Sequence, residues 1–285
     1  MADPKGSAPS IVAAAARAAA AADRLGERFA LELQRVLRRT AVAMPDLLSV
    51  LTKVAPDQAA ASVGVSRYQI RRILRDAGFD ALAEGAYGPA LDPVIRRMLA
   101  LRKASGLDAT LTAEQTLQLE AFGALYRQDL LLEGDLAARA IWRAAVRGVL
   151  GGSDVRDIQA ELSQVLDRTE PQVRTLYDTS VSIFSRQVEA IQAGDDPETL
   201  YLYSHPIDGI TRPWCLKHAG RVYSRREIDQ MDNGQFGPVF LACGGWNCRG
   251  AFVELSLASG LRELHGTTKR VPEIQTAIDG LADAA

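Results

Sequence analysis

All three cysteines of this 285-residue chain, Cys215, Cys243 and Cys248, fall in the segment from Asp208 to Glu254. Two of the three tryptophans of the chain stand there too, each within two residues of a cysteine. Small reduced thiols packed with aromatic rings are typical of a compact core, and paired cysteines and histidines are typical of metal sites. We therefore expect this segment to be held in one fixed shape.

Composition narrows the class of protein. Hydrophobic residues make up 47% of the chain and charged residues 24%, which is ordinary for a globular protein of one large domain or two smaller ones. The formal net charge of -2 gives no whole-chain attraction to nucleic acids or membrane surfaces. Three cysteines are too few, and odd in number, for a secreted disulfide scaffold, so synthesis in the cytosol is expected.

An apolar run near the N-terminus, Ile11–Ala22, needs to be tested as a targeting or membrane segment. It consists mostly of alanine, is interrupted by Arg17 and is followed by Asp23 and Arg24. Alanine is only weakly hydrophobic but is the best helix former, so the run predicts a surface helix and neither a signal peptide nor a membrane span. No membrane partner is expected.

The pattern of residues divides the chain into two regions. From Ser10 to about Gly194 the apolar residues recur at helical spacing, and glycine and proline interrupt them only at intervals. Beyond Asp196 glycine, proline and asparagine become frequent, and short apolar runs appear that are typical of strands. The sequence therefore predicts a mainly α N-terminal region, residues 1–195, followed by a small α+β C-terminal module, residues 196–285.

Local signals place some of the elements. Capping boxes at Thr112–Gln115 and Thr169–Gln172 predict two helix starts, and Ser224 with Glu227 predicts a third. The stripe that follows Thr169 has one apolar face and predicts a helix that ends at Gly194. Closing helices are expected near 256–264 and 271–284. The predicted strands are Leu200–Tyr203, Val222–Tyr223, Val239–Leu241 and Ala251–Leu255.

The spacing of the cysteines allows a metal site. Two residues separate Cys215 from His218, and Cys243 and Cys248 form a second close pair, so that four ligands suited to tetrahedral zinc stand in two groups. Structural zinc is thus one interpretation. Three buried, inert thiols and a disulfide between Cys215 and Cys248 are the alternatives that the sequence leaves open.

Catalysis is the weaker interpretation of the same residues. A cysteine with a nearby histidine and Asp208 has the residue types of a thiol nucleophile and its base. However, the sequence contains no known nucleophile motif, no phosphate-binding glycine loop and no HExxH zinc motif. We therefore expect that the protein is not an enzyme.

A helix-turn-helix hairpin is a further possibility at residues 57–76. Small alanines would lie on a first helix, Gly64 at the turn, and Ser66 at the start of a second helix. That second helix would present Arg67, Arg71 and Arg72 outward, where they could contact DNA. A structural hairpin without DNA binding needs the same residue types for its packing.

The C-terminal segment resembles the phage Mu F-like minor head proteins, also called the phage head-morphogenesis family. The resemblance covers roughly residues 150–255 and includes the helix at Thr169–Ile191. It is carried by residues that occur in the same order: Asp208, Thr211, Arg212, Cys215, Gly220, Val222, Tyr223, Glu227, Ile228, Asn233, Gly234, Gln235, Pro238, Val239, Gly244, Gly245, Asn247, Cys248 and Arg249. Asp208, Arg212, Gly234, Asn247 and Arg249 are expected to be structural, with the Arg249 guanidinium binding carbonyls and Asp208.

This resemblance implies a minor structural protein of a tailed bacteriophage or prophage. It implies association with the portal or the major capsid protein, support of head assembly or DNA delivery, and a location in the virion after assembly in the host cytoplasm. Contacts with packaged double-stranded DNA would be non-specific. Two alternatives remain: a DNA-binding protein that acts through the 57–76 hairpin, and a toxin or transferase with its activity in the N-terminal region.

Overall fold

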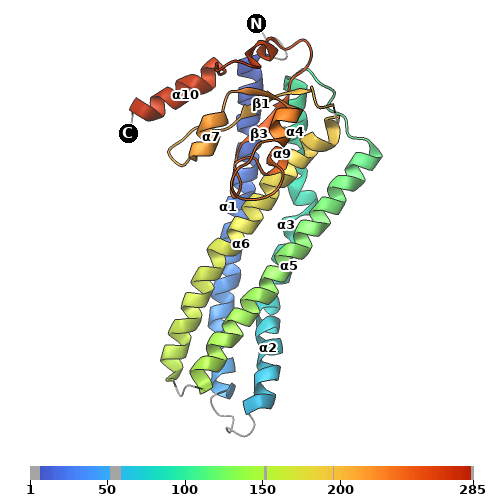
Figure 1. Ribbon diagram of the computed structural model, residues 1–285. Coiled ribbons are helices and arrows are strands. Elements are labelled where there is room, and N and C mark those ends of the chain that lie inside the picture. The colour runs from blue at the N-terminus through green and yellow to red at the C-terminus, as the bar shows by residue number, and fades with distance from the viewer. Residues whose placement is uncertain (1–6, 52–58, 151–152, 195, 284–285) are drawn as a thin grey trace. The chain divides into compact units, whose positions relative to one another are not determined.

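The computed structural model describes residues 7–51, 59–150, 153–194 and 196–283. Long helices make up most of the described chain before residue 195, and a module with a three-stranded sheet and short helices follows (Figure 1). The predicted fold class, a mainly α N-terminal region followed by a small α+β module, is confirmed. Within the described ranges, no helix combines the length and apolar composition needed to cross a bilayer.

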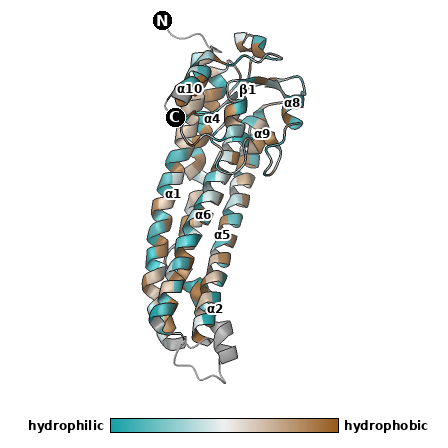
Figure 2. Ribbon diagram, turned by 60° about the vertical axis from the view of Figure 1, so that its left-hand side comes forward, coloured by the Kyte–Doolittle hydropathy of each residue, from teal (hydrophilic) through white to brown (hydrophobic). Residues whose placement is uncertain are grey.

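The helices before residue 195 are amphipathic. Figure 2 shows polar and apolar residues along each long helix, as expected where one face is buried. The apolar stripe predicted after Thr169 is buried from Val173 to Val188. In chain order the elements are α1 (Ala8–Leu51), α2 (Ala59–Asp76), α3 (Phe79–Ala86), the 3-10 helix η2 (Gly88–Leu91), α4 (Asp92–Ala104), α5 (Ala113–Leu150) and α6 (Val155–Gln192).

One of the two predicted capping boxes in this region is formed and one is not. Thr112 and Gln115 exchange both expected hydrogen bonds at the start of α5. Thr169 instead lies inside α6, and its hydroxyl donates to the Val165 carbonyl at 2.8 Å. The second prediction is wrong. Pro171 removes one hydrogen bond of the helix, but burial of the continuous apolar stripe stabilises the helix by more than that loss, so α6 continues past Thr169.

The module after residue 195 is built on an antiparallel sheet with the order β2-β1-β3. Its strands are β1 (Leu200–Ser204), β2 (Val222–Ser224) and β3 (Ala251–Glu254), so three of the four predicted strands are confirmed. The central strand β1 pairs Leu202 with Val222 on one side and with Val253 on the other. All five residues of β1 are buried, which makes it the centre of the module.

The fourth predicted strand is a short helix. Val239–Leu241 lies in α9 (Val239–Ala242), where Pro238 precedes the first turn and Val239 and Phe240 are both buried. Two adjacent buried side chains suit a helix packed on a sheet better than a half-buried strand. The other helices of the module are α7 (Pro213–His218), α8 (Arg225–Asp229), η3 (Gly260–Leu264) and α10 (Pro272–Asp283), and α8 has the predicted capping box.

The described chain forms two compact units. One comprises Met1–Arg24, Leu91–Phe122 and Asp178–Ala285, and the other comprises Leu25–Ala90 and Gly123–Tyr177. This grouping differs from the predicted division at residue 195. The sheet module shares its unit with α4 and with the C-terminal part of α6, because side chains on those helices are buried against the module.

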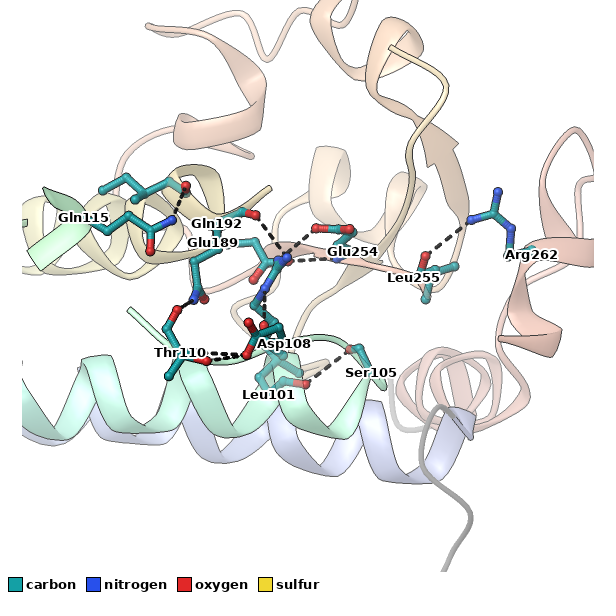
Figure 3. Close-up of polar contacts among 12 residues, drawn as sticks. Leu101, Ser105, Asp108, Thr110, Gln115, Glu189, Gln192, Glu254, Leu255 and Arg262 are labelled. Carbon is teal, nitrogen blue, oxygen red and sulfur yellow. Dashed lines mark hydrogen bonds and ion pairs between the residues drawn. The ribbon is translucent and has the colours of Figure 1, made fainter. Parts of the chain in front are cut away.

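Arg102 of α4 makes the main polar connection within this first unit. Its guanidinium donates to Glu254 Oε2 at 2.8 Å, to Glu189 Oε1 at 3.3 Å and to the Gln192 carbonyl at 3.1 Å, while its Nε donates to the Asp108 carbonyl at 2.8 Å. Figure 3 shows Glu189, Gln192, Glu254 and Asp108 converging from different parts of the chain. The side chains of Arg102 and Glu189 are both buried.

The second unit has an aromatic core. Phe29 stacks on Tyr177 with ring centroids 4.0 Å apart, and the Tyr177 hydroxyl donates to the Ala86 carbonyl at 3.2 Å. Gly134 of α5 lies so close to Phe79 of α3 that a Cβ at this glycine would be 2.6 Å from Phe79 Cε1. Close packing of α3 and α5 therefore depends on a glycine at position 134.

The predicted helix-turn-helix hairpin is not formed. Residues 57 and 58 lie outside the described residues, but α2 runs without interruption from Ala59 to Asp76, so no turn occurs at Gly64. Arg71 forms ion pairs with Asp80 at 2.8 Å and with Asp135 at 2.5 Å. The other two predicted DNA contacts, Arg67 and Arg72, are exposed. Arg72 forms an ion pair with Asp76 at 3.6 Å.

Candidate metal centre

The core of the sheet module brings three potential metal ligands together. Cys215 comes from α7, His205 directly follows β1, and Cys248 stands in the loop before β3. Their ligand atoms all lie within 4.8 Å of one another, and all three side chains are buried. These residues could hold a metal ion. Imidazole nitrogen and thiolate sulfur are the ligands that zinc prefers in structural sites.

The distance between the two sulfurs fits a shared ion. Cys215 Sγ and Cys248 Sγ are 3.7 Å apart, and all three cysteines are free thiols. A disulfide would need about 2.05 Å between the sulfurs. Two zinc–sulfur bonds of about 2.3 Å at a tetrahedral angle would place the sulfurs about 3.8 Å apart. The observed spacing thus resembles that of two ligands on one metal ion, and the disulfide considered from the sequence is absent.

The groups around these ligands orient them. His205 Nδ1 lies 2.5 Å from the Pro206 carbonyl, so when Nδ1 carries the proton the Nε2 lone pair is left for a metal. The Tyr203 hydroxyl donates to Cys215 Sγ at 3.5 Å and lies 3.4 Å from Cys248 Sγ. The Gly244 amide donates to Cys248 Sγ at 3.3 Å. Such donors stabilise negative charge on thiolate sulfur.

Two glycines leave the space that the cluster needs. A Cβ at Gly244 would lie 2.5 Å from Cys215 Sγ, and one at Gly250 would lie 2.7 Å from His205 Cδ2 and even closer to the Tyr203 hydroxyl. Any other residue at either position would push a ligand or its hydrogen-bonding partner away. The glycines at these positions are therefore part of the site.

A buried cation lies next to the cysteines. The guanidinium of Arg186, on α6, donates to three backbone carbonyls, those of Gly250 at 2.8 Å, Leu241 at 2.7 Å and Cys248. The residue is 2% exposed. Its own desolvation opposes the charge, but the charges that cysteines 243 and 248 can carry raise the pKa of Arg186 above its usual range. The site thus combines thiols with a fixed positive charge.

The three thiols do not titrate alike. The neighbouring thiol of Cys248, together with burial, raises the pKa of Cys215, and burial above all raises the pKa of Cys243. The hydrogen bond from Cys215, followed by the influence of Cys243, holds the pKa of Cys248 well below its usual range. Cys248 is therefore the sulfur on which a negative charge is best stabilised.

Two of the four predicted ligands join the cluster, and His205 takes the place expected for His218. His218 Nδ1 lies 2.8 Å from the Tyr223 hydroxyl, and its ring packs 4.3 Å from that of Trp214. Burial, followed by the charge of Lys217, lowers the pKa of His218 to about 4. The fourth predicted ligand, Cys243, is buried beside the cluster and influences the pKa of Cys248, but it is not one of the three clustered residues.

The residues expected to be structural bind loops together. Arg249 Nη2 donates to Asp208 Oδ1 at 2.7 Å, and Arg212 Nη2 donates to the Trp246 carbonyl at 2.6 Å. The backbone amide of Asn247 donates to Thr179 Oγ1 at 3.1 Å, and Asn247 itself has a φ of 53°. Gly234 has a φ of 68°, a backbone angle that residues other than glycine seldom adopt.

A neighbouring asparagine was not singled out from the sequence as a structural residue. Asn233 Nδ2 donates to the Cys243 carbonyl at 2.9 Å, and Asn233 Oδ1 accepts from the Gln235 amide at 2.8 Å. Its side chain therefore joins the loop after α8 to the end of α9. The sequence signal that could have identified it is the Asn-Gly pair that Asn233 forms with Gly234, which is typical of tight turns.

Comparison with known proteins found no relative. No protein family, no curated protein and no solved structure matches the chain.

Proposed function

We propose that the protein is a minor structural protein of a tailed bacteriophage or prophage that supports head assembly or DNA delivery. The proposal rests on the resemblance of residues 150–255 to the Mu F-like head-morphogenesis proteins. Its expected partners are the portal and the major capsid protein, with non-specific contacts to packaged DNA. Its expected locations are the host cytoplasm during assembly and then the phage head.

The observation that carries the proposal is the set of contacts that the resembling residues make in the fold. Asp208 pairs with Arg249, Arg212 binds a carbonyl at Trp246, and Asn247 binds Thr179. Each contact joins segments that are far apart in the sequence. These residues therefore act as braces of a small module, which fits a family whose shared pattern specifies a rigid structural part.

The surroundings of the cysteines favour a structural role over turnover. A cavity of about 30 Å³ borders Arg186, Cys248 and Gly250. It has room for a water molecule but not for a substrate of ordinary size. Since the thiols are buried as well, a nucleophile among them would have no access to a substrate. We infer a protein that works by binding partners.

Structural zinc is the ion we propose for the cluster of His205, Cys215 and Cys248. One imidazole and two thiols favour zinc over magnesium or calcium, which prefer oxygen ligands. The module is small and its sheet has only short strands, so a metal that joins β1, α7 and the loop before β3 would add directly to its folding free energy.

Particle composition tests the proposed function. Phage particles produced from the genome that encodes the chain should contain it at low copy, both in intact heads and in tailless precursors, when the particles are purified and quantified by mass spectrometry. Presence on free DNA and absence from every particle would contradict the proposal and favour a DNA-binding role.

A pair of variants links that test to the module. Arg249→Ala removes the brace to Asp208 and should reduce incorporation into heads. Arg226→Ala removes an exposed ion pair with Glu198 and should leave incorporation unchanged. Equal incorporation of both variants would show that the braced module is not what the particle recognises.

A further inference from the structure

Three protein ligands leave the coordination of a structural zinc ion incomplete. Structural zinc sites are almost always tetrahedral and closed, with four protein ligands. Among the described residues, His205, Cys215 and Cys248 are the three whose ligand atoms gather within 4.8 Å. A fourth ligand would come from a residue beside the cluster, and Cys243 is a buried free thiol in the same packed core as Cys215 and Cys248.

The environment of Arg186 provides an independent argument about charge. Its guanidinium is buried, and its hydrogen-bond acceptors within the described residues are backbone carbonyls, which carry no net charge. Two of these carbonyls belong to Gly250 and Cys248, so the cation lies directly beside the cluster. A buried cation without a counter-charge is strongly destabilising, so this region of the core needs one negative charge.

A third thiolate ligand would supply both the missing fourth ligand of zinc and the negative charge beside Arg186. Zinc with one neutral imidazole and two thiolates has no net charge and leaves Arg186 uncompensated. A third thiolate makes the site singly negative, which balances the single positive charge of Arg186. We propose that Cys243 is the fourth ligand of a zinc site formed with His205, Cys215 and Cys248, and that Arg186 is the counter-ion of this site. This inference rests on the zinc proposed above.

The local backbone supports a specific role for Cys243. Its φ of 47° and ψ of -120° are rare for a residue with a side chain, and such strain persists only where the surroundings require it. The Cys243 carbonyl accepts a hydrogen bond from Asn233 Nδ2, and the Cys243 amide donates to the Val239 carbonyl at 2.7 Å. Both backbone groups are thus held, so completing the shell requires mainly movement of the thiol toward Cys248.

X-ray absorption at the zinc edge tests the ligand set on the unaltered protein. The full-length chain, purified from zinc-supplemented cells, should contain about one zinc per chain, and the absorption fine structure should fit three sulfur neighbours and one nitrogen. One zinc with only two sulfur neighbours would overturn the inference about Cys243 and leave the zinc proposal standing. Absence of zinc from the full-length chain would overturn both.

Cobalt substitution of a variant provides a second test of whether Cys243 is a ligand. The sulfur-to-cobalt charge-transfer absorption grows with the number of thiolates on the ion. Cys243→Ser should therefore lower this absorption by about a third, and it should speed the loss of metal to a chelator. Unchanged absorption in Cys243→Ser would overturn the inference. Ser256→Ala, at a position outside the cluster, is the control and should keep the full signal.

Replacing Arg186 tests the counter-ion. Arg186→Met should speed the loss of zinc to a chelator by at least tenfold, because it leaves a buried negative site without its cation. The double variant Arg186→Met with Cys243→Ser restores neutrality and should lose zinc more slowly than Arg186→Met alone. A double variant that loses zinc faster than either single variant would contradict the charge balance.

Discussion

The guanidinium of Arg249 lies 2.7 Å from both carboxylate oxygens of Asp208, across a separation of 41 residues in the sequence. Asp208 also accepts hydrogen bonds from the Thr211 hydroxyl at 3.0 Å and from the Ile210 amide at 3.2 Å. Burial opposes the ionised form, but the hydrogen bonds from Arg249 and Thr211 outweigh it and lower the pKa of Asp208. The pair therefore fixes the loop after β1 against the loop before β3.

Loss of this pair should loosen the module moderately. Arg249→Ala is expected to lower the free energy of unfolding by about 1 kcal/mol, a small value because the Asp208 side chain is 41% exposed and water screens the charges. Chemical denaturation followed by tryptophan fluorescence measures the effect. Arg226→Ala, which breaks a more exposed pair with Glu198, is the control and should change stability by less.

Space at Gly250 should matter more than this ion pair. Gly250→Ala is expected to destabilise the protein by about 1–3 kcal/mol, because the added methyl group would press on the Tyr203 hydroxyl and on His205. Gly209→Ala is the matched control, since a Cβ there meets nothing within 4 Å. Equal decreases of the thermal unfolding midpoint in the two variants would contradict the expectation that close packing at position 250 requires glycine.

Much of the fold follows from local sequence patterns. Helical spacing of apolar residues predicted α6, and short aromatic and β-branched runs predicted the three strands. The errors occur where burial overrides a local signal. Thr169 has the form of a helix cap but lies in the middle of α6, and Gly64 has the form of a turn but lies inside α2. In α6 a continuous buried face decides the outcome, whereas α2 continues as a helix through Gly64.

In the candidate site, the sequence predicted Cys215 and Cys248 but not His205. The two-residue gap after Cys215 points to His218, but α7 directs that side chain to Tyr223 and Trp214. His205 reaches the cluster because β1 ends beside α7 and β3, and no spacing rule in the sequence describes that pairing. Arg186 was missed for a similar reason, since an arginine beside an apolar stripe is usually exposed.

Helix packing in the second unit can be tested with another pair of glycines. Gly134→Ala should destabilise by about 1–3 kcal/mol, since its Cβ would lie 2.6 Å from Phe79 Cε1. Gly85→Ala, in α3, meets nothing within 4 Å and should stabilise by about 0.5–1 kcal/mol, because alanine favours a helix over glycine. Denaturation midpoints that move in the same direction would contradict the packing of α3 on α5.

Glu189 should make stability depend on pH. Burial raises the pKa of Glu189 to about 7, although Arg102 and the Glu254 amide favour its ionised form and oppose the shift. Arg102 already pairs with Glu254, so one cation faces two carboxylates. A raised pKa means that the folded state binds more protons than the unfolded state between the usual carboxyl pKa and about 7. The free energy of unfolding should therefore fall as pH rises through that interval.

The variant Glu189→Gln isolates this contribution, because glutamine resembles the protonated acid and can still accept from Arg102. Its stability relative to the original protein should increase by about 2–3 kcal/mol between pH 5 and pH 8, at about 1.4 kcal/mol for each unit of pKa shift. Urea denaturation at several pH values measures the difference. Glu198→Gln, at an exposed pair, should show little change. If the original protein instead gains stability over Glu189→Gln as pH rises, then Arg102 dominates and Glu189 is ionised in the folded protein well below pH 7.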